Sequence, residues 1–186
     1  MTNRKNRVTL ISLAILLSLG VFSPALYALI WHVQHGSRIT FRGAEVRVPI
    51  GWVAEPGEVR MLDFTKFPVL IFGLTDSTSG FGLGKLPDAG SRDPEEIYKS
   101  WVTVNWTLWN STKGVVKGPF TFGTGEKEVV CMSSFQNADS SSGMASCLLF
   151  HRTWMAQFIG NGKDVETFFR VLRGASTVEE RSIGKR

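Results

Sequence analysis

The stretch VVCMSSFQNADSSSGMASCLLF, residues 129–150, decides the fold of this chain. Two apolar runs flank a polar loop rich in turn-forming residues, which is the pattern of an antiparallel β-hairpin. Cys131 and Cys147, the two cysteines of the chain, are symmetric about the middle of that loop. A regular hairpin places them opposite each other, close to disulfide range. We therefore predict a Cys131–Cys147 bridge, which would stabilise the fold by ~3 kcal/mol.

A one-residue bulge is the alternative, because it would separate the two cysteines and leave them reduced and buried. In either case both faces of the hairpin are apolar. One face is expected to hold Val129, Cys131, Cys147 and Leu149, and the other Val130, Met132, Leu148 and Phe150. Each face needs a cover, and helices packed on the sheet would supply it.

Other strand-like runs extend the hairpin into a sheet. Val115–Phe122 and Arg152–Ile159 complete a meander of four antiparallel strands. Farther upstream the expected strands are a hairpin of Ile39–Phe41 with Val46–Val48, then Glu58–Phe64 and Pro68–Leu74. The last run is almost continuously apolar, as in a strand buried on both faces. Trp52, at the corner between the hairpin and the next strand, is expected in the core.

Two helices are predicted. Asp93-Pro94-Glu95-Glu96 is a helix start, because aspartate caps, proline suits the first helical position and acids suit the positive end of the dipole. This helix should end near Trp109–Asn110. Its expected core face is Ile97, Trp101, Val104 and Leu108, widened by Tyr98, Val102 and Trp109. The second helix begins near Asp164 and buries Val165, Phe168, Phe169 and Leu172.

Trp106 lies off the apolar stripe of the first helix, whereas Trp101 and Trp109 lie on it. An aromatic side chain on the outer side of a helix is a candidate contact for a protein partner. We therefore single out Trp106 as the candidate partner contact.

The segment Val8–Trp31 has twenty-four residues and no charged side chain. That length is sufficient for a helix to cross a bilayer. Arg4, Lys5 and Arg7 precede it without any acidic residue, so the positive-inside rule places the N-terminus in the cytoplasm. The sequence thus predicts a single-pass protein of the cell membrane with an extracytoplasmic domain.

A cleaved signal peptide is the competing interpretation of the same segment. Ser23-Pro24-Ala25 places small residues where a signal peptidase would cut, and cleavage near Ala25 would give a secreted form. We favour the retained anchor, because Tyr27 and Trp31 are the aromatic types that settle at the outer membrane interface.

The expected domain organisation is a cytoplasmic stub and anchor over residues 1–35, one extracytoplasmic domain over 36–176, and a flexible tail over 177–186. Of the 21 basic residues four precede residue 39 and no acidic residue does, which leaves the rest almost balanced against 16 acids. The basic excess therefore belongs to the anchor's flanks, and we expect no nucleic-acid partner.

Few residues carry a recognisable chemistry. The stretch Gly80-Phe-Gly82-Leu-Gly84-Lys85 lacks the spacing of phosphate-binding loops, so we expect a flexible loop or a glycine-punctuated strand there. His151 is the only histidine outside the pair His32 and His35. The three do not have zinc spacing, and we expect no metal, no cofactor and no catalytic residue.

Phe41–Trp52, FRGAEVRVPIGW, and the order strands, helix, strands, helix together resemble the PsbP-like fold family. The resemblance implies a central antiparallel sheet with helices packed on it, in members that mostly bind or assemble other proteins rather than catalyse. This chain differs from the plant members in its hydrophobic anchor and in lacking an evident metal cluster.

We thus expect an α+β fold: a single N-terminal transmembrane helix followed by one domain with a central antiparallel sheet and two main helices packed on it. The expected function is a membrane-anchored extracytoplasmic, non-enzymatic binding or assembly module of the cell envelope. A small extracytoplasmic hydrolase or ligand-binding protein is the alternative. Its hydrolase form would pair His151 with a serine such as those at Ser140–Ser142.

Overall fold

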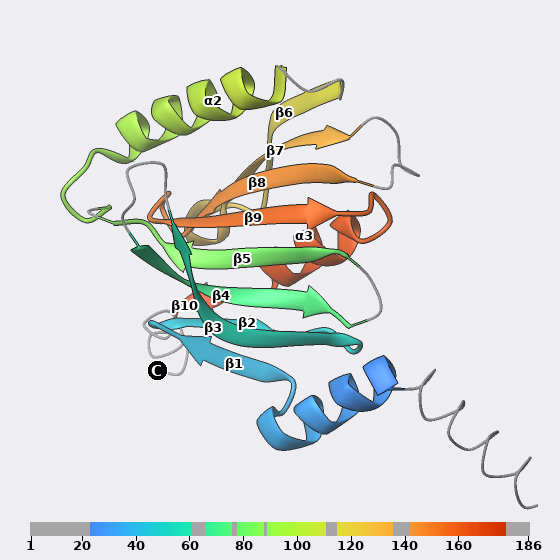
Figure 1. Cartoon of the computed structure of the whole chain (residues 1–186). Coiled ribbons are helices and arrows are strands. Elements are labelled where there is room, and N and C mark those ends of the chain that lie inside the picture. The colour runs from blue at the N-terminus through green and yellow to red at the C-terminus, as the bar shows by residue number, and fades with distance from the viewer. Residues whose placement is uncertain are drawn as a thin grey trace, which may run out of the picture.

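A computed structural model describes residues 23–60, 66–75, 78–87, 89–110, 115–135 and 142–177. These residues form a mixed α+β fold in which helices pack on a central antiparallel sheet (Figure 1). The α+β class predicted from the sequence is therefore confirmed.

The central sheet has seven strands in the order β3-β4-β5-β9-β8-β7-β6, and all of its pairings are antiparallel. In chain order the strands are β3 (Trp52–Arg60), β4 (Lys66–Leu74), β5 (Gly80–Lys85), β6 (Val115–Phe122), β7 (Val129–Phe135), β8 (Gly143–Leu149) and β9 (Trp154–Gly160). The four last strands are neighbours in sequence order, which confirms the predicted meander. A short 3-10 helix, Gly125–Lys127, joins β6 to β7.

A smaller sheet consists of β1 (Arg38–Phe41), β2 (Ala44–Arg47) and β10 (Ser176–Thr177). Arg42 and Gly43 both have positive φ, 48° and 89°, as a two-residue hairpin turn requires. We expected the tail to be flexible from residue 177 and frayed after Ser176, but Thr177 pairs with Ala44. The later residues, 178–186, lie outside the described part.

β3 begins at Trp52, six residues before the strand predicted at Glu58, and passes through Pro56 and Gly57. These two residues are unfavourable in a central strand, which explains why the sequence pattern missed this part. β3 is an edge strand that pairs with β4 alone, so a proline without an N–H group is tolerated there. Residues 61–64 of the predicted strand lie outside the described residues.

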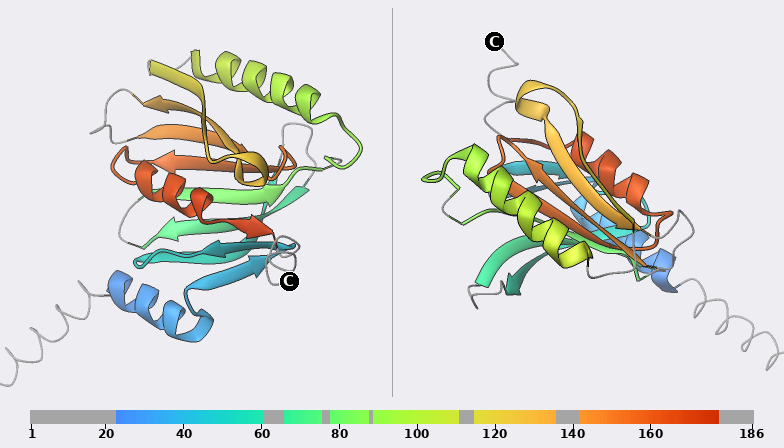
Figure 2. Two further views of the ribbon diagram at one scale, coloured as in Figure 1. Left: turned by 180° about the vertical axis from the view of Figure 1, so that it is seen from behind. Right: turned by 90° about the horizontal axis from the view of Figure 1, so that it is seen from above.

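Two helices cover opposite faces of the central sheet, as Figure 2 shows from above. α3 (Val165–Arg173) buries Phe168, Val171 and Leu172 in the larger core. α2 (Pro94–Asn110) contributes Ile97, Trp101 and Trp109 to a second, smaller core with residues of β7 and β8. Both predicted helices are therefore present at the expected places.

The buried face of α2 differs from the predicted one. The buried positions are Ile97, Trp101, Asn105 and Trp109, at a constant spacing of four, whereas Val104 and Leu108 are 46% and 52% exposed. The prediction was wrong for Val104 and Leu108, because the predicted core face was wider than the side of the helix that contacts the sheet. Only one flank lies against the sheet.

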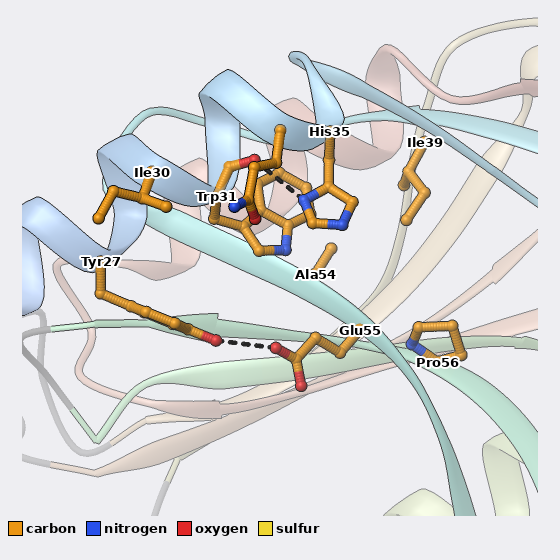
Figure 3. A pocket seen from close by; sticks show the side chains of 9 residues that line it. Tyr27, Ile30, Trp31, His35, Ile39, Ala54, Glu55 and Pro56 are labelled. Atoms are coloured by element: carbon orange, nitrogen blue, oxygen red, sulfur yellow. Dashed lines mark hydrogen bonds between the residues drawn. The ribbon is translucent and has the colours of Figure 1, made fainter.

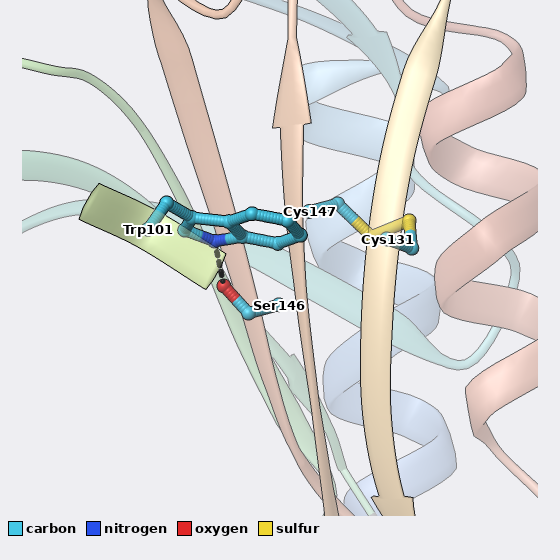
Figure 4. The surroundings of a disulfide bond; sticks show 4 residues. All are labelled: Trp101, Cys131, Ser146 and Cys147. Atoms are coloured by element: carbon cyan, nitrogen blue, oxygen red, sulfur yellow. Dashed lines mark hydrogen bonds between the residues drawn. A yellow bond between two sulfur atoms is a disulfide. The ribbon is translucent and has the colours of Figure 1, made fainter. Parts of the chain in front are cut away.

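The structure joins Cys131 and Cys147, which are directly paired residues of β7 and β8, by a disulfide (Figure 4). Both side chains are fully buried on the α3 face of the sheet. Phe150 also belongs to that core, contrary to the expected alternation. At Phe150 the chain leaves β8 with a positive φ of 49°, which turns the ring to the other face.

An N-terminal helix is described from residue 23 to residue 35. Its Ala28 and Trp31 are buried, and Trp31 is part of the larger core. We expected Trp31 at the outer membrane interface; instead it packs on the domain. No helix within the described residues is long and apolar enough to span a membrane, and residues 8–22 of the predicted span lie outside that part.

Candidate functional site

A groove of about 870 Å³ lies between α2 and one face of the central sheet, and we call it the α2 groove. α2 packs against β7 and β8 and leaves the same face of β4, β5 and β9 without a helix. In the view from above in Figure 2, the β3–β4 end of the sheet curves toward the side on which α2 lies. Residues of α2 and of the sheet both line the groove. The volume falls within the range of ligand pockets, roughly 300–1,000 Å³.

The floor of the groove is low because β5 presents glycines to it. Phe81 and Leu83 point into the larger core, so the alternating residues Gly80, Gly82 and Gly84 face the groove side. A Cβ added at Gly82 would meet only Val69, at 3.9 Å. At Gly84 it would meet the ring of Phe67 at 2.8 Å, so the floor is filled at that end.

The walls are aliphatic and aromatic. Five large apolar side chains that line the groove are at least 43% exposed: Val59, Ile71, Val104, Leu108 and Ile159. They come from three strands and from α2, and they line the same groove, so they form one apolar surface rather than scattered positions. An exposed apolar surface of this kind is typical of binding sites in folded proteins.

Polar groups are few. Arg92, just before α2, is the only ionisable residue among those that line the groove, and it forms no ion pair with a described residue. Asn105 is 4% exposed and donates a hydrogen bond from Nδ2 to the carbonyl oxygen of Trp101 at 2.8 Å. Gln157 is an exposed amide on β9. The arrangement can hold an apolar group and offers a single positive charge to it.

α2 is held beside the groove by two sets of contacts. The indole Nε1 of Trp101 donates to Oγ of Ser146, which is fully buried on β8, at 2.8 Å (Figure 4). Arg152 pairs with Glu95 and lies over the ring of Tyr98 at 4.5 Å. These contacts fix one wall of the groove relative to its floor.

The turn that carries Arg152 is unusual. Phe150, His151 and Arg152 have successive positive φ values of 49°, 55° and 66°. Non-glycine residues with such values are uncommon, and a run of three costs free energy that other contacts must offset. Burial of Phe150 and the contacts of Arg152 with α2 are the compensating interactions.

A second cleft, of about 560 Å³, separates the N-terminal helix from β3 (Figure 3). In it, the hydroxyl of Tyr27 donates to Glu55 at 2.9 Å, and the ring of Trp31 stacks on His35 at a centroid distance of 4.8 Å. Nε2 of His32 donates to the carbonyl oxygen of Pro49 at 3.0 Å. The cleft therefore lies along the contact between the N-terminal helix and the rest of the domain.

The residues singled out from the sequence do not meet in one place. Trp106 is 38% exposed on α2 and does not line the groove. His151 is exposed in the turn after β8, whereas Ser142 precedes that strand, so more than about 20 Å of extended chain separates them. Ser140 and Ser141 lie outside the described residues. Ser142 and His151 are therefore not brought together.

Sequence reasoning missed the α2 groove, although a signal for it exists. The glycines at alternate positions of residues 80–84 can share one face only if the stretch is a strand, which was one of the two expectations for it. No group of three or more histidine, cysteine or acidic residues in the described part is placed to hold a metal ion.

Comparison with known proteins adds no assignment. No protein-family model matches the sequence, and no curated protein shows significant similarity to it.

Proposed function

We propose that this chain is a membrane-anchored, extracytoplasmic and non-enzymatic binding module whose binding site is the α2 groove. The observation that carries the proposal is the contiguous exposed apolar lining over a glycine floor. Leaving five large apolar side chains in water forgoes the favourable free energy of burying them, roughly 25 cal/mol for each Å². An apolar ligand in the groove would supply that burial.

The membrane anchor is supported by the sequence and by the outer side of the N-terminal helix. Leu26, Leu29 and Val33 are 44–79% exposed, and none of them lines the cleft between this helix and β3. Because Trp31 is committed to the core, we place the span earlier than first expected, from Val8 to about Leu26. Nineteen residues in a helix rise about 28 Å, close to the thickness of the hydrocarbon core.

Photolabelling tests the binding site in the full chain. The probe is a dodecanol that carries a diazirine in its alkyl chain, added to the protein in phosphatidylcholine nanodiscs. Peptides from β4, β5 and α2 should be labelled, and Gly82→Leu should lower that labelling because its side chain fills the floor. The matched control is Gly73→Leu, since Gly73 lies in β4 outside the lining and an added Cβ there meets nothing within 4 Å. Equal labelling of both variants would contradict the proposal.

A topology reporter tests the anchor. The reporter is fused after Arg186, and the mass of the mature protein is measured in the same cells. Retention in the membrane fraction at full mass, with the reporter outside, is the expected result. A soluble product shortened by about twenty-five residues would replace the anchor by a cleaved signal peptide.

A protein partner that contacts Trp106 is the second proposal. The exposure of its indole outside the groove favours it, because tryptophan is enriched at the energetic centres of interfaces. A photocrosslinking amino acid at position 106 in the membrane-embedded chain should capture one reproducible protein. The same amino acid at Lys99, an exposed position of α2, is the control.

A further inference from the structure

The residues that line the α2 groove also indicate the chemical class of its ligand, including the polar head group. We propose that it takes the alkyl chain of a single-chain amphiphile with an anionic carboxylate head, and that Arg92 binds the head. This inference rests on the proposed function of the groove and adds to it the class of ligand.

The dimensions of the groove favour an alkyl chain over a partner helix. A helix is about 10–12 Å in diameter, so 870 Å³ would hold only about one and a half to two turns of it. Along α2 the lining extends from Ile97 to Leu108, which is a rise of about 16 Å. With C–C bonds of about 1.5 Å, an extended chain of roughly twelve to fourteen carbons spans that distance.

Charge favours an anionic head. Arg92 is the one ionisable residue of the lining, and it lies next to the start of α2, at one end of that length. Two acids near Arg92 interact with other groups: the carboxylate of Asp93 accepts the backbone N–H of Glu95 at 3.0 Å, and Glu95 pairs with Arg152. Neither acid lines the groove. A guanidinium binds a carboxylate through two parallel hydrogen bonds, so a fatty-acid head complements it.

The proposed tether explains where such a ligand would come from. A domain held at the bilayer surface meets single-chain amphiphiles of the membrane at high local concentration. When an alkyl chain binds in the groove, the apolar lining is removed from contact with water, which is favourable.

Three diazirine probes with the same dodecyl chain and different heads test the inference on the full chain in phosphatidylcholine nanodiscs. They are dodecanoate, dodecanol and dodecyltrimethylammonium, and labelling is read on the peptides of β4, β5 and α2. We expect dodecanoate to label these peptides about tenfold more than the cation, the lower end of the effect of charge-assisted hydrogen bonds. Arg92→Gln should abolish this preference, whereas Arg47→Gln, an exposed arginine of β2, should keep it.

Equal labelling by the three probes, unchanged in Arg92→Gln but lost in Gly82→Leu, would overturn the inference about the head and leave the proposed function intact. Absence of groove labelling by all three probes, with no crosslinking of a Leu–Glu amphipathic helical peptide to α2 either, would overturn both. Labelling by none of them, together with crosslinking of a Leu–Glu amphipathic helical peptide to α2, would replace the amphiphile by a partner helix.

Discussion

Ile71 of β4 lies directly opposite Gly82 of β5, and both residues face the α2 groove. The isoleucine is 43% exposed because its neighbour across the ladder has no side chain to cover it. In an ordinary sheet a β-branched or aromatic residue at position 82 would pack on Ile71 and close the face. Gly82 therefore leaves the floor of the groove open beside Ile71, at a cost in strand stability.

The two neighbouring glycines of β5 should respond differently to a methyl group. Gly84→Ala places a Cβ 2.8 Å from the Phe67 ring and from the carbonyl oxygen of Pro68, which amounts to overpacking. We expect a loss of about 1–3 kcal/mol in the free energy of unfolding. Gly82→Ala meets only ordinary contacts and should be neutral or stabilising by about 0.4–1 kcal/mol. Chemical denaturation compares the two, and a similar loss in both would contradict the assigned floor.

Trp101→Phe removes the indole donor to Ser146 but keeps an aromatic ring in the core. Because the serine hydroxyl is fully buried, we expect destabilisation by about 1–3 kcal/mol. Adding Ser146→Ala should recover part of this loss, since no buried hydroxyl is then left without its donor. Trp106→Phe is the control and should stay within about 0.5 kcal/mol. We expect the destabilisation of the double variant to be smaller than the sum of the two single effects. Simple additivity of the two effects would contradict the hydrogen bond between Trp101 and Ser146.

Replacing both cysteines, Cys131→Ala with Cys147→Ala, should lower the free energy of unfolding by ~3 kcal/mol. The loss arises because the bridge closes a loop of sixteen positions in the unfolded chain. The measurement is chemical denaturation of the disulfide-bonded native protein and of the double variant side by side. An unchanged midpoint would show that the bridge contributes nothing to stability.

The docking of the N-terminal helix can be tested at Trp31. Trp31→Ala should destabilise the domain by about 3–5 kcal/mol, because the indole is 4% exposed in the larger core. Leu29→Ala on the same helix is the matched control, since Leu29 is 60% exposed and makes no such core contact. Equal effects of the two changes would place the helix away from the domain.

Much of the fold follows from local patterns in the sequence. Three features could be recognised from residues close together in the sequence. They are the symmetric spacing of Cys131 and Cys147, the alternation in the meander and the Asp93-Pro94 cap. The edge position of β3 permits Pro56 in a strand, but this position depends on the order of the whole sheet and not on nearby residues.

The groove could not be derived in the same way. Whether Val104 and Leu108 are covered depends on which strands lie beneath α2, and that depends on the order of the whole sheet. Trp31 was assigned to the membrane interface because its type fits both a bilayer surface and a protein core. Only the packing of the helix on the domain distinguishes the two.

Amide chemical shifts test the central claim most directly. The full chain in deuterated lipid nanodiscs is titrated with dodecanol, and two-dimensional NMR follows each backbone and indole N–H. We predict shifts concentrated at Gly80, Gly82 and the indole N–H of Trp101, with residues of the N-terminal cleft such as Glu55 unchanged. Shifts confined to the N-terminal helix and β3, or none at the glycines of β5, would contradict the α2 groove as the binding site.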